Sequence, residues 1–170
     1  STATTTKVVE VKVNPVADDP ILEIVELTPF GYEDSMTLVN ISRFALVDTD
    51  GSETLTLELR TNDTNVRAVQ MGGELVNGSL SAKGEETVFS LASALTGYRT
   101  LHVQAADDFS GVITFDVVAI ATEDADKWSN GDFAETSLTV HMLIFGTADT
   151  PTFFRPSKIV TGFEDTLTHV

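Results

Sequence analysis

The clearest feature of the sequence is the alternation of apolar and polar residues in short runs. From Thr54 to Arg60, three leucines alternate with Thr and Glu. A period of two is typical of a β-strand with one face against a core, because successive side chains point to opposite faces. We therefore expect a core between two sheets that includes a set of apolar residues at this spacing: Leu55, Leu57, Leu59, Phe115, Val117 and Val140.

Similar runs predict strands along most of the chain. The expected strands are Val8–Val13, Ile21–Leu27, Met36–Ile41, Thr54–Arg60, Asn65–Gln70, Val88–Leu95, Arg99–Gln104, Val112–Thr122 and Thr136–Ile144. The sixth is expected to run into one helical turn, the last two to form a hairpin, and residues 71–84 to form loops and a short hairpin. No segment of helical length has a 3.6-residue period, so the pattern predicts an all-β, antiparallel sandwich.

One turn between two apolar runs, Asp48-Thr49-Asp50-Gly51-Ser52-Glu53, combines three carboxylates with a glycine. Glycine, Asp and Ser all favour tight turns. Carboxylates this close repel one another unless a cation neutralises them, and Ca²⁺ takes about six to eight oxygens from Asp, Glu and backbone carbonyls. Two interpretations are open for this turn, a calcium site and a solvated hairpin turn.

Two blocks of the chain, 14–39 and 145–170, align without a gap at an offset of 131 residues. The identical positions are Ala17, Asp18, Pro20, Gly31, Glu33, Asp34, Thr37 and Val39, matched by Ala148, Asp149, Pro151, Gly162, Glu164, Asp165, Thr168 and Val170. Such self-similarity indicates tandem repeats. We therefore divide the chain into the last strand of one repeat (1–13), a linker (14–20), a complete sandwich repeat (21–144), a second linker (145–151) and the opening strands of the next repeat (152–170).

The net charge of the chain argues against some classes of binding partner. It has 26 acidic and 10 basic residues, a formal net charge of −16. Nucleic acids and anionic membranes need clustered Lys and Arg, and no apolar run approaches the ~18 residues of a membrane span, so we expect neither nucleic-acid binding nor membrane insertion. The chain has no cysteine and so no disulfide, and in an extracellular protein bound Ca²⁺ can stabilise the fold instead. No nucleophile, zinc or phosphate-loop motif occurs, and no enzymatic activity is expected.

Five motifs, in order along the chain, carry a resemblance to a known family: Val11–Pro20 (VKVNPVADDP), Glu33–Ser35 (EDS), Val47–Leu57 (VDTDGSETLTL), Asp108–Gly111 (DFSG) and Ala119–Glu123 (AIATE). They resemble the linker and repeat motifs of bacterial cadherin-like or Ig-like repeats in large, type I-secreted RTX-type adhesins. The resemblance implies secreted, extracellular, cell-surface sandwiches strung into a stalk, with Ca²⁺ held at the junctions. The ligands that it implies are Asp18, Asp19, Glu33, Asp34, Asp48, Asp50, Glu53, Asp108 and Asp149.

Parts of the chain depart from these motifs. The second linker lacks the Asn-Pro and one acid of the first linker, so whether this junction binds Ca²⁺ is left open. Residues 62–99 match little of the repeat motifs of this family. A loop around Trp128 has EF-hand-like spacing, with Asp124, Asp126, Asn130, Asp132 and Glu135 as the spaced residues. Ser129 stands where that motif requires glycine and the flanks are strands, so a polar hairpin loop is favoured. The three histidines show no metal spacing.

Two functions from different classes follow. The first is a structural and adhesive repeat of a calcium-rigidified stalk or surface filament, whose partners are neighbouring repeats of the same chain or fibre and a host or substratum glycan or protein. The second is a sugar- or peptide-binding module that uses 62–99 or the Trp128 loop. A sugar platform needs two or three exposed aromatic rings together. The aromatic residues here are spread along the predicted strands, which favours the first function.

Overall fold

The computed structural model describes residues 3–11, 16–48, 51–81, 84, 86–93, 99–123 and 132–151. All regular structure in these ranges is β-strand. The strands are β1 (Ile21–Ile24), β2 (Phe30–Tyr32), β3 (Met36–Ala45), β4 (Glu53–Thr61), β5 (Val66–Met71), β6 (Glu74–Val76), β7 (Gly78–Leu80), β8 (Thr87–Ser93), β9 (Arg99–Ala105), β10 (Gly111–Glu123) and β11 (Phe133–Phe145). The described residues include no helix that is long and apolar enough to cross a bilayer.

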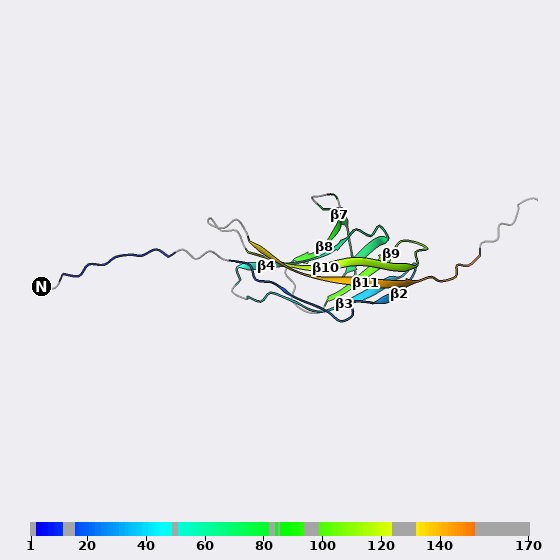
Figure 1. Ribbon diagram of the computed structural model, residues 1–170, viewed down its shortest axis with the longest axis horizontal. Helices are drawn as coiled ribbons and strands as arrows, with labels where there is room; N and C mark the ends of the chain where they lie inside the picture. Colours follow the sequence, from blue (N-terminus) through cyan, green and yellow to red (C-terminus); the bar gives the residue numbers. More distant parts are fainter. Residues whose placement is uncertain are drawn as a thin grey trace, which may run out of the picture.

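The strands form two sheets that pack face to face. One sheet has the order β1-β3-β9-β5-β6, and the other has the order β2-β11-β10-β4-β8-β7. The sandwich is elongated along β10 and β11, and the chain enters at one end and leaves at the other (Figure 1). The prediction of an all-β sandwich is confirmed.

The core lies between the sheets and contains the residues expected there. Leu57 and Leu59 on β4 and Val117 on β10 are fully buried, and they share one cluster with Val39 on β3 and Leu101 on β9 from the other sheet. The remaining three predicted core residues, Leu55, Phe115 and Val140, also belong to this cluster. The alternation of Leu with Thr and Glu along β4 therefore sets which face of the strand is buried.

The hairpin of β10 and β11 is the longest pairing in the fold. It runs antiparallel from Gly111 opposite Ile144 to Thr122 opposite Phe133, and β4 pairs with the other side of β10. The predicted hairpin of these two strands is confirmed. At about 3.3 Å per residue, the 13 residues of β10 span about 40 Å, so its two ends lie at opposite ends of the sandwich.

The expected strand Ile21–Leu27 is shorter than predicted, and a short strand that the pattern did not predict, β2, follows it in the other sheet. β1 pairs antiparallel with β3 and ends at Ile24, whereas β2 pairs in parallel with β11. The chain between them crosses the edge of the sandwich, and the carbonyl groups of Leu27 and Pro29 accept hydrogen bonds from β11 amides. Proline cannot donate in a ladder, but its carbonyl can accept. Sequence periodicity does not reveal such a change of sheet.

Residues 71–84 divide between the two sheets. Met71 pairs with Glu74 across Gly72 and Gly73, whose φ angles are 61° and 89°, so a two-residue turn joins β5 to β6. Such turns need positive φ at both central residues, which glycine adopts without strain. The next strand, β7, leaves for the other sheet and pairs with β8. The short hairpin is confirmed, while the helical turn expected after Val88 falls on 94–98, outside the described residues.

The structure describes no strand in the part of Val8–Val13 that it covers, and because we assigned that strand to a preceding repeat, it stays a prediction. Residues 3–11 form no strand, and Val8, Val9 and Val11 are exposed. A strand needs a neighbouring backbone and an apolar surface to cover, and the segment runs away from the sandwich in Figure 1. Residues 152–170 lie outside the described part, so the division into repeats stays a prediction.

Candidate metal centre

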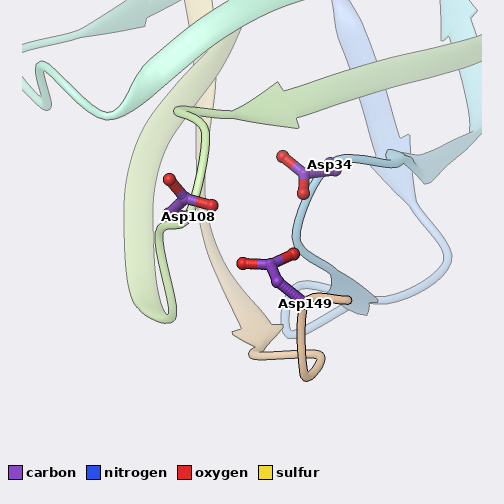
Figure 2. A group of neighbouring side chains, drawn as sticks. All are labelled: Asp34, Asp108 and Asp149. Carbon is purple, nitrogen blue, oxygen red and sulfur yellow. The ribbon is translucent and has the colours of Figure 1, made fainter. Parts of the chain in front are cut away.

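Three of the nine implied ligands meet at the end of the sandwich where the chain leaves it. One carboxylate oxygen from each of Asp34, Asp108 and Asp149 lies within 4.8 Å of the others. Figure 2 shows the three side chains converging from three separate segments. Asp34 lies in the turn from β2 to β3, Asp108 in the turn from β9 to β10, and Asp149 follows β11. All three are exposed, and hard oxygen ligands of this kind suit Ca²⁺.

The two turns hold their aspartates in the left-handed region of φ. Asp34 has a φ of 59° and Asp108 a φ of 57°. Asp tolerates this conformation better than most residues, since its short polar side chain can bond locally. The turn at Asp108 is closed by a 3.2 Å hydrogen bond from the Phe109 amide to the Ala106 carbonyl. The local sequence of each turn thus places one carboxylate at the same end of the sandwich.

Glu33 ties the segment after β11 to this site. Its amide donates to the Phe145 carbonyl at 3.0 Å, and its Oε1 accepts hydrogen bonds from the Thr147 amide and, at 3.1 Å, from the Thr147 hydroxyl. The side chain is only 9% exposed. In this structure Glu33 therefore positions the backbone that carries Asp149, and it does not belong to the three-aspartate cluster.

At the opposite end, the entering linker meets β4. The Asp18 amide donates to Glu53 Oε1 at 2.9 Å, and the Thr136 hydroxyl on β11 donates to the Pro20 carbonyl at 2.6 Å. The side chains of Asp18 and Asp19 are exposed. The structure thus places Asp18 beside Glu53, and the contact is made by the backbone amide of Asp18.

Glu123 is a candidate ligand that the sequence analysis did not include. It ends β10, lies opposite Glu53 on β4, and is 4% exposed. The Ser52 hydroxyl donates to its Oε1 at 3.0 Å. A signal was present in the sequence, because Ala119, Ala121 and Glu123 share one face of the strand by period two. An acid on a core-facing position is unusual without a partner.

The remaining predicted site residues do not join a described cluster. Asp48 is exposed in the turn after β3 and makes an interaction there, and Asp50 lies outside the described residues. In the loop of EF-hand-like spacing, residues 124–131 also lie outside the described part, including Trp128. Glu135, the last residue of the EF-hand-like spacing, pairs with Arg60. The Arg60 guanidinium donates to both carboxylate oxygens of Glu135, at 2.9 and 3.1 Å. That hydrogen bond is the main cause that raises the pKa of the Arg60 guanidinium above its usual range.

The expectation that aromatic residues are dispersed is wrong. Phe30 and Tyr32 on β2 flank Phe145 on β11, with ring centroids 6.2 and 6.1 Å apart, and all three are exposed. They adjoin an apolar groove of about 560 Å³ on the outer face of the sheet. Its lining residues are Thr28, Phe30, Val112, His141, Leu143 and Phe145. The rings meet because β2 lies in parallel beside β11, which their separation in sequence conceals.

No protein-family model and no curated protein matches the sequence. Among solved structures, AvmM, which catalyses macrocyclization in alchivemycin A biosynthesis, is similar at 10% identity and a TM-score of 0.44, over 81% of this chain and 94% of that chain. AggA, the major subunit of aggregative adherence fimbriae type I from Escherichia coli, is similar at 14% identity and a TM-score of 0.38, over 78% and 100%. One neighbour is an enzyme and the other a fimbrial subunit, so the function of this chain is argued from its own residues.

Proposed function

We propose that this chain is a non-enzymatic, extracellular structural and adhesive repeat, and that Ca²⁺ bound at its ends stiffens a stalk or surface filament. The observation that carries the proposal is the convergence of Asp34, Asp108 and Asp149 where the chain leaves the sandwich. The motifs that resemble RTX-type adhesin repeats support the same function. Neighbouring repeats and a host or substratum glycan or protein are the proposed partners.

The mechanism follows from which segments the three carboxylates belong to. Two of them, Asp34 and Asp108, lie in turns of the sandwich, and Asp149 lies in the segment that continues the chain. Without a cation the three charges repel, while hydrogen bonds to Glu33 still hold the exit segment against the sandwich. A bound Ca²⁺ would join the exit segment to both turns, because it draws oxygens from all three. The direction of the next repeat relative to this sandwich would then be restrained.

Calcium titration by calorimetry tests the proposal. The wild-type chain should bind Ca²⁺ with a dissociation constant of about 10⁻⁴–10⁻³ M, the range of extracellular modules. Asp108→Asn should weaken binding at the exit end at least tenfold. Asp107→Asn is the matched control, because Asp107 is the adjacent exposed acid, pairs with Arg67 and lies outside the cluster. Equal binding by all three proteins would contradict a calcium site at this end.

Hydrogen exchange gives a second readout at the exit segment. Ca²⁺ should slow exchange of the Thr147 amide, which already donates to Glu33, in the wild type and in Asp107→Asn. In Asp149→Asn the same amide should exchange at one rate with Ca²⁺ and with chelator. If the wild type shows no calcium dependence at residues 146–149, the cation does not hold this segment.

The aromatic groove supports a second candidate function, binding of a sugar or an apolar peptide. Phe30, Tyr32 and Phe145 provide exposed rings beside one another, which is the feature that a stacking site for sugar rings requires. Glycan and peptide arrays probed with Ca²⁺ present test this candidate. A ligand bound by the wild type and lost in Phe145→Ala, but kept in Leu80→Ala at an exposed site on β7, would assign it to the groove.

A further inference from the structure

An apolar patch surrounds the groove beside Phe145 on the outer face of the larger sheet. Phe30 on β2 is 62% exposed and Phe145 on β11 is 44% exposed, and Leu143 and Val112 are exposed beside them. Among the described residues, nothing covers these side chains. Apolar surface left in water is unfavourable, and a contiguous patch of it on a soluble domain marks an interaction site.

The internal repeat argues that the fold itself does not require this patch. At the offset of 131 residues, the end of β11 aligns with the segment before the first linker. The core-facing positions stay apolar at this offset, with Val140, Met142 and Ile144 matched by Val9, Val11 and Val13. The outer-facing positions do not, with His141, Leu143 and Phe145 matched by Glu10, Lys12 and Asn14. The apolar outer face is therefore specific to one of the two copies, as expected of a binding surface.

Negative charge lies at the ends of the same three strands that line the groove. Asp34 lies just after β2, Asp108 just before β10 and Asp149 just after β11. None of the ion pairs between described residues involves these three acids. Even with one Ca²⁺ bound, three carboxylates keep one net negative charge. The groove is thus apolar, and acids border the strands that form it.

We infer that this groove binds a segment of another protein that presents a large apolar side chain with Lys or Arg beside it. The inference rests on the proposed adhesive function and names the chemistry of its protein partner. The apolar side chain fills the groove, and the basic residue faces the acids at the strand ends. A second copy of this chain does not fit as the occupant, because it would bring the same net charge of −16.

Two features favour a protein segment over a sugar. Of the residues that line the groove, only Thr28 and His141 have polar side chains, and His141 Nδ1 is already 3.2 Å from the Thr114 hydroxyl oxygen. A sugar that lost its hydration there would leave hydroxyl groups unpaired, which is costly. In addition, β2 is an edge strand, with no strand of the described residues beyond it. The backbone of an extended peptide can pair with such an edge while one of its side chains enters the adjacent groove.

Arrays of synthetic peptides and of glycans, probed with the full chain, test the inference. Three peptide sets are compared: peptides with Phe or Leu flanked by Lys and Arg, the same peptides with Glu in place of the basic residues, and the same peptides with Ser in place of Phe and Leu. The wild type should bind members of the first set at least tenfold more tightly than their counterparts in the other two. The preference for basic over acidic peptides should shrink at high salt, because salt screens exposed charges.

A variant designed from the internal repeat removes the groove. His141→Glu/Leu143→Lys/Phe145→Asn gives β11 the outer-face residues of the matching segment, and it should bind the first peptide set at least tenfold more weakly. Thr139→Val is the matched control, because it exchanges the neighbouring outer-face position for the matching Val8 and does not line the groove. Melting temperatures check that both proteins are folded. If the triple variant is not, Phe145→Ala decides the same question, since that side chain is exposed.

The outcomes separate the explanations. The inference is overturned if no peptide binds, if the basic and acidic sets bind equally, or if the groove variant binds as the wild type does. Glycans bound by the wild type and lost in the groove variant, with no peptide bound, would assign the groove to a sugar and also overturn it. Calorimetry with Ca²⁺ is the separate measurement for the proposed stalk. Calcium binding without peptide binding removes this partner and leaves the calcium-stiffened stalk standing, and peptide binding without calcium binding does the reverse.

Discussion

The guanidinium of Arg60 on β4 donates to both carboxylate oxygens of Glu135 on β11, reaching across β10, which lies between the two strands. It also donates to Glu58 at 2.9 Å on its own strand. The two salt bridges leave the Arg60 side chain 24% exposed. These contacts join β4 to β11 across β10 on the outer face of the larger sheet. A second ion pair, between Arg67 and Asp107, is half-exposed and joins β5 to a turn.

The difference between these two ion pairs predicts different losses of stability. Arg60→Met should lower the free energy of unfolding by about 1.5–3 kcal/mol, because it leaves two partly buried carboxylates without their donor. Arg67→Met should lower it by less than about 1 kcal/mol, as is usual for exposed pairs. Urea unfolding of both variants measures the difference. Equal losses of unfolding free energy in the two variants would show that the Arg60–Glu135 pair across β10 stabilises the fold no more than an ordinary surface ion pair.

Leu57 tests the register of the core. It is fully buried on β4, whereas Leu80 on β7 is 72% exposed. Leu57→Ala should lower the free energy of unfolding by about 2–5 kcal/mol through lost burial and the cavity left behind. Leu80→Ala should change it by less than about 0.5 kcal/mol. Chemical denaturation of the two variants checks this, and a loss below about 0.5 kcal/mol for Leu57→Ala would place that side chain outside the core.

Gly31 on β2 tests the close packing of the two sheets where the chain crosses between them. A β-carbon on residue 31 would lie 2.9 Å from Thr37 Cβ and closer still to its hydroxyl oxygen. Gly31→Ala should therefore destabilise the sandwich by about 1–3 kcal/mol through overpacking. Thr37→Ala in the same chain should restore part of that loss, because it removes the hydroxyl and methyl groups. The Thr37 hydroxyl is itself buried with no hydrogen-bond partner in the described residues.

A double-mutant cycle measures this coupling. Thr37→Ala alone should cost less than Gly31→Ala, and the double variant should be more stable than the sum of the two losses predicts. Strict additivity would mean that contact with Thr37 does not explain why residue 31 is glycine.

Small-angle scattering tests the stiffness of the junction in a protein with two successive repeats. In Ca²⁺, the three-aspartate cluster should make the wild-type protein with two repeats longer and stiffer than it is in chelator. The reason is that the cation then joins Asp149 to Asp34 and Asp108. Asp149→Asn should give the scattering profile of a flexible junction even in Ca²⁺. An unchanged melting temperature would show that each sandwich is still folded. Asp107→Asn should behave as wild type. Identical maximum dimensions in Ca²⁺ and chelator would show that the acids are a solvated spacer.

The acidic residues illustrate how far the sequence could predict the site. Resemblance to repeat motifs selected Asp34, Asp108 and Asp149 among nine acids, but it did not distinguish these three from the others. Their meeting depends on two turns and an exit segment that the packing of the strands brings to one end of the sandwich. Glu123 was omitted because its significance depends on the strand opposite, and the register that pairs it with Glu53 is a tertiary property.

The sequence by itself determined which residues form the core and that the fold is all-β. The period of two along β4 and β10 is a local property, since it follows from the alternating direction of side chains on an extended backbone. Only the tertiary structure decided which strands are neighbours, and with them the aromatic cluster at Phe145, the change of sheet between β1 and β2, and the pairing of Glu53 with Glu123. Strand order and register depend on contacts between segments that are far apart in the sequence, such as Phe30 and Leu143, and no local pattern of polar and apolar residues specifies those contacts.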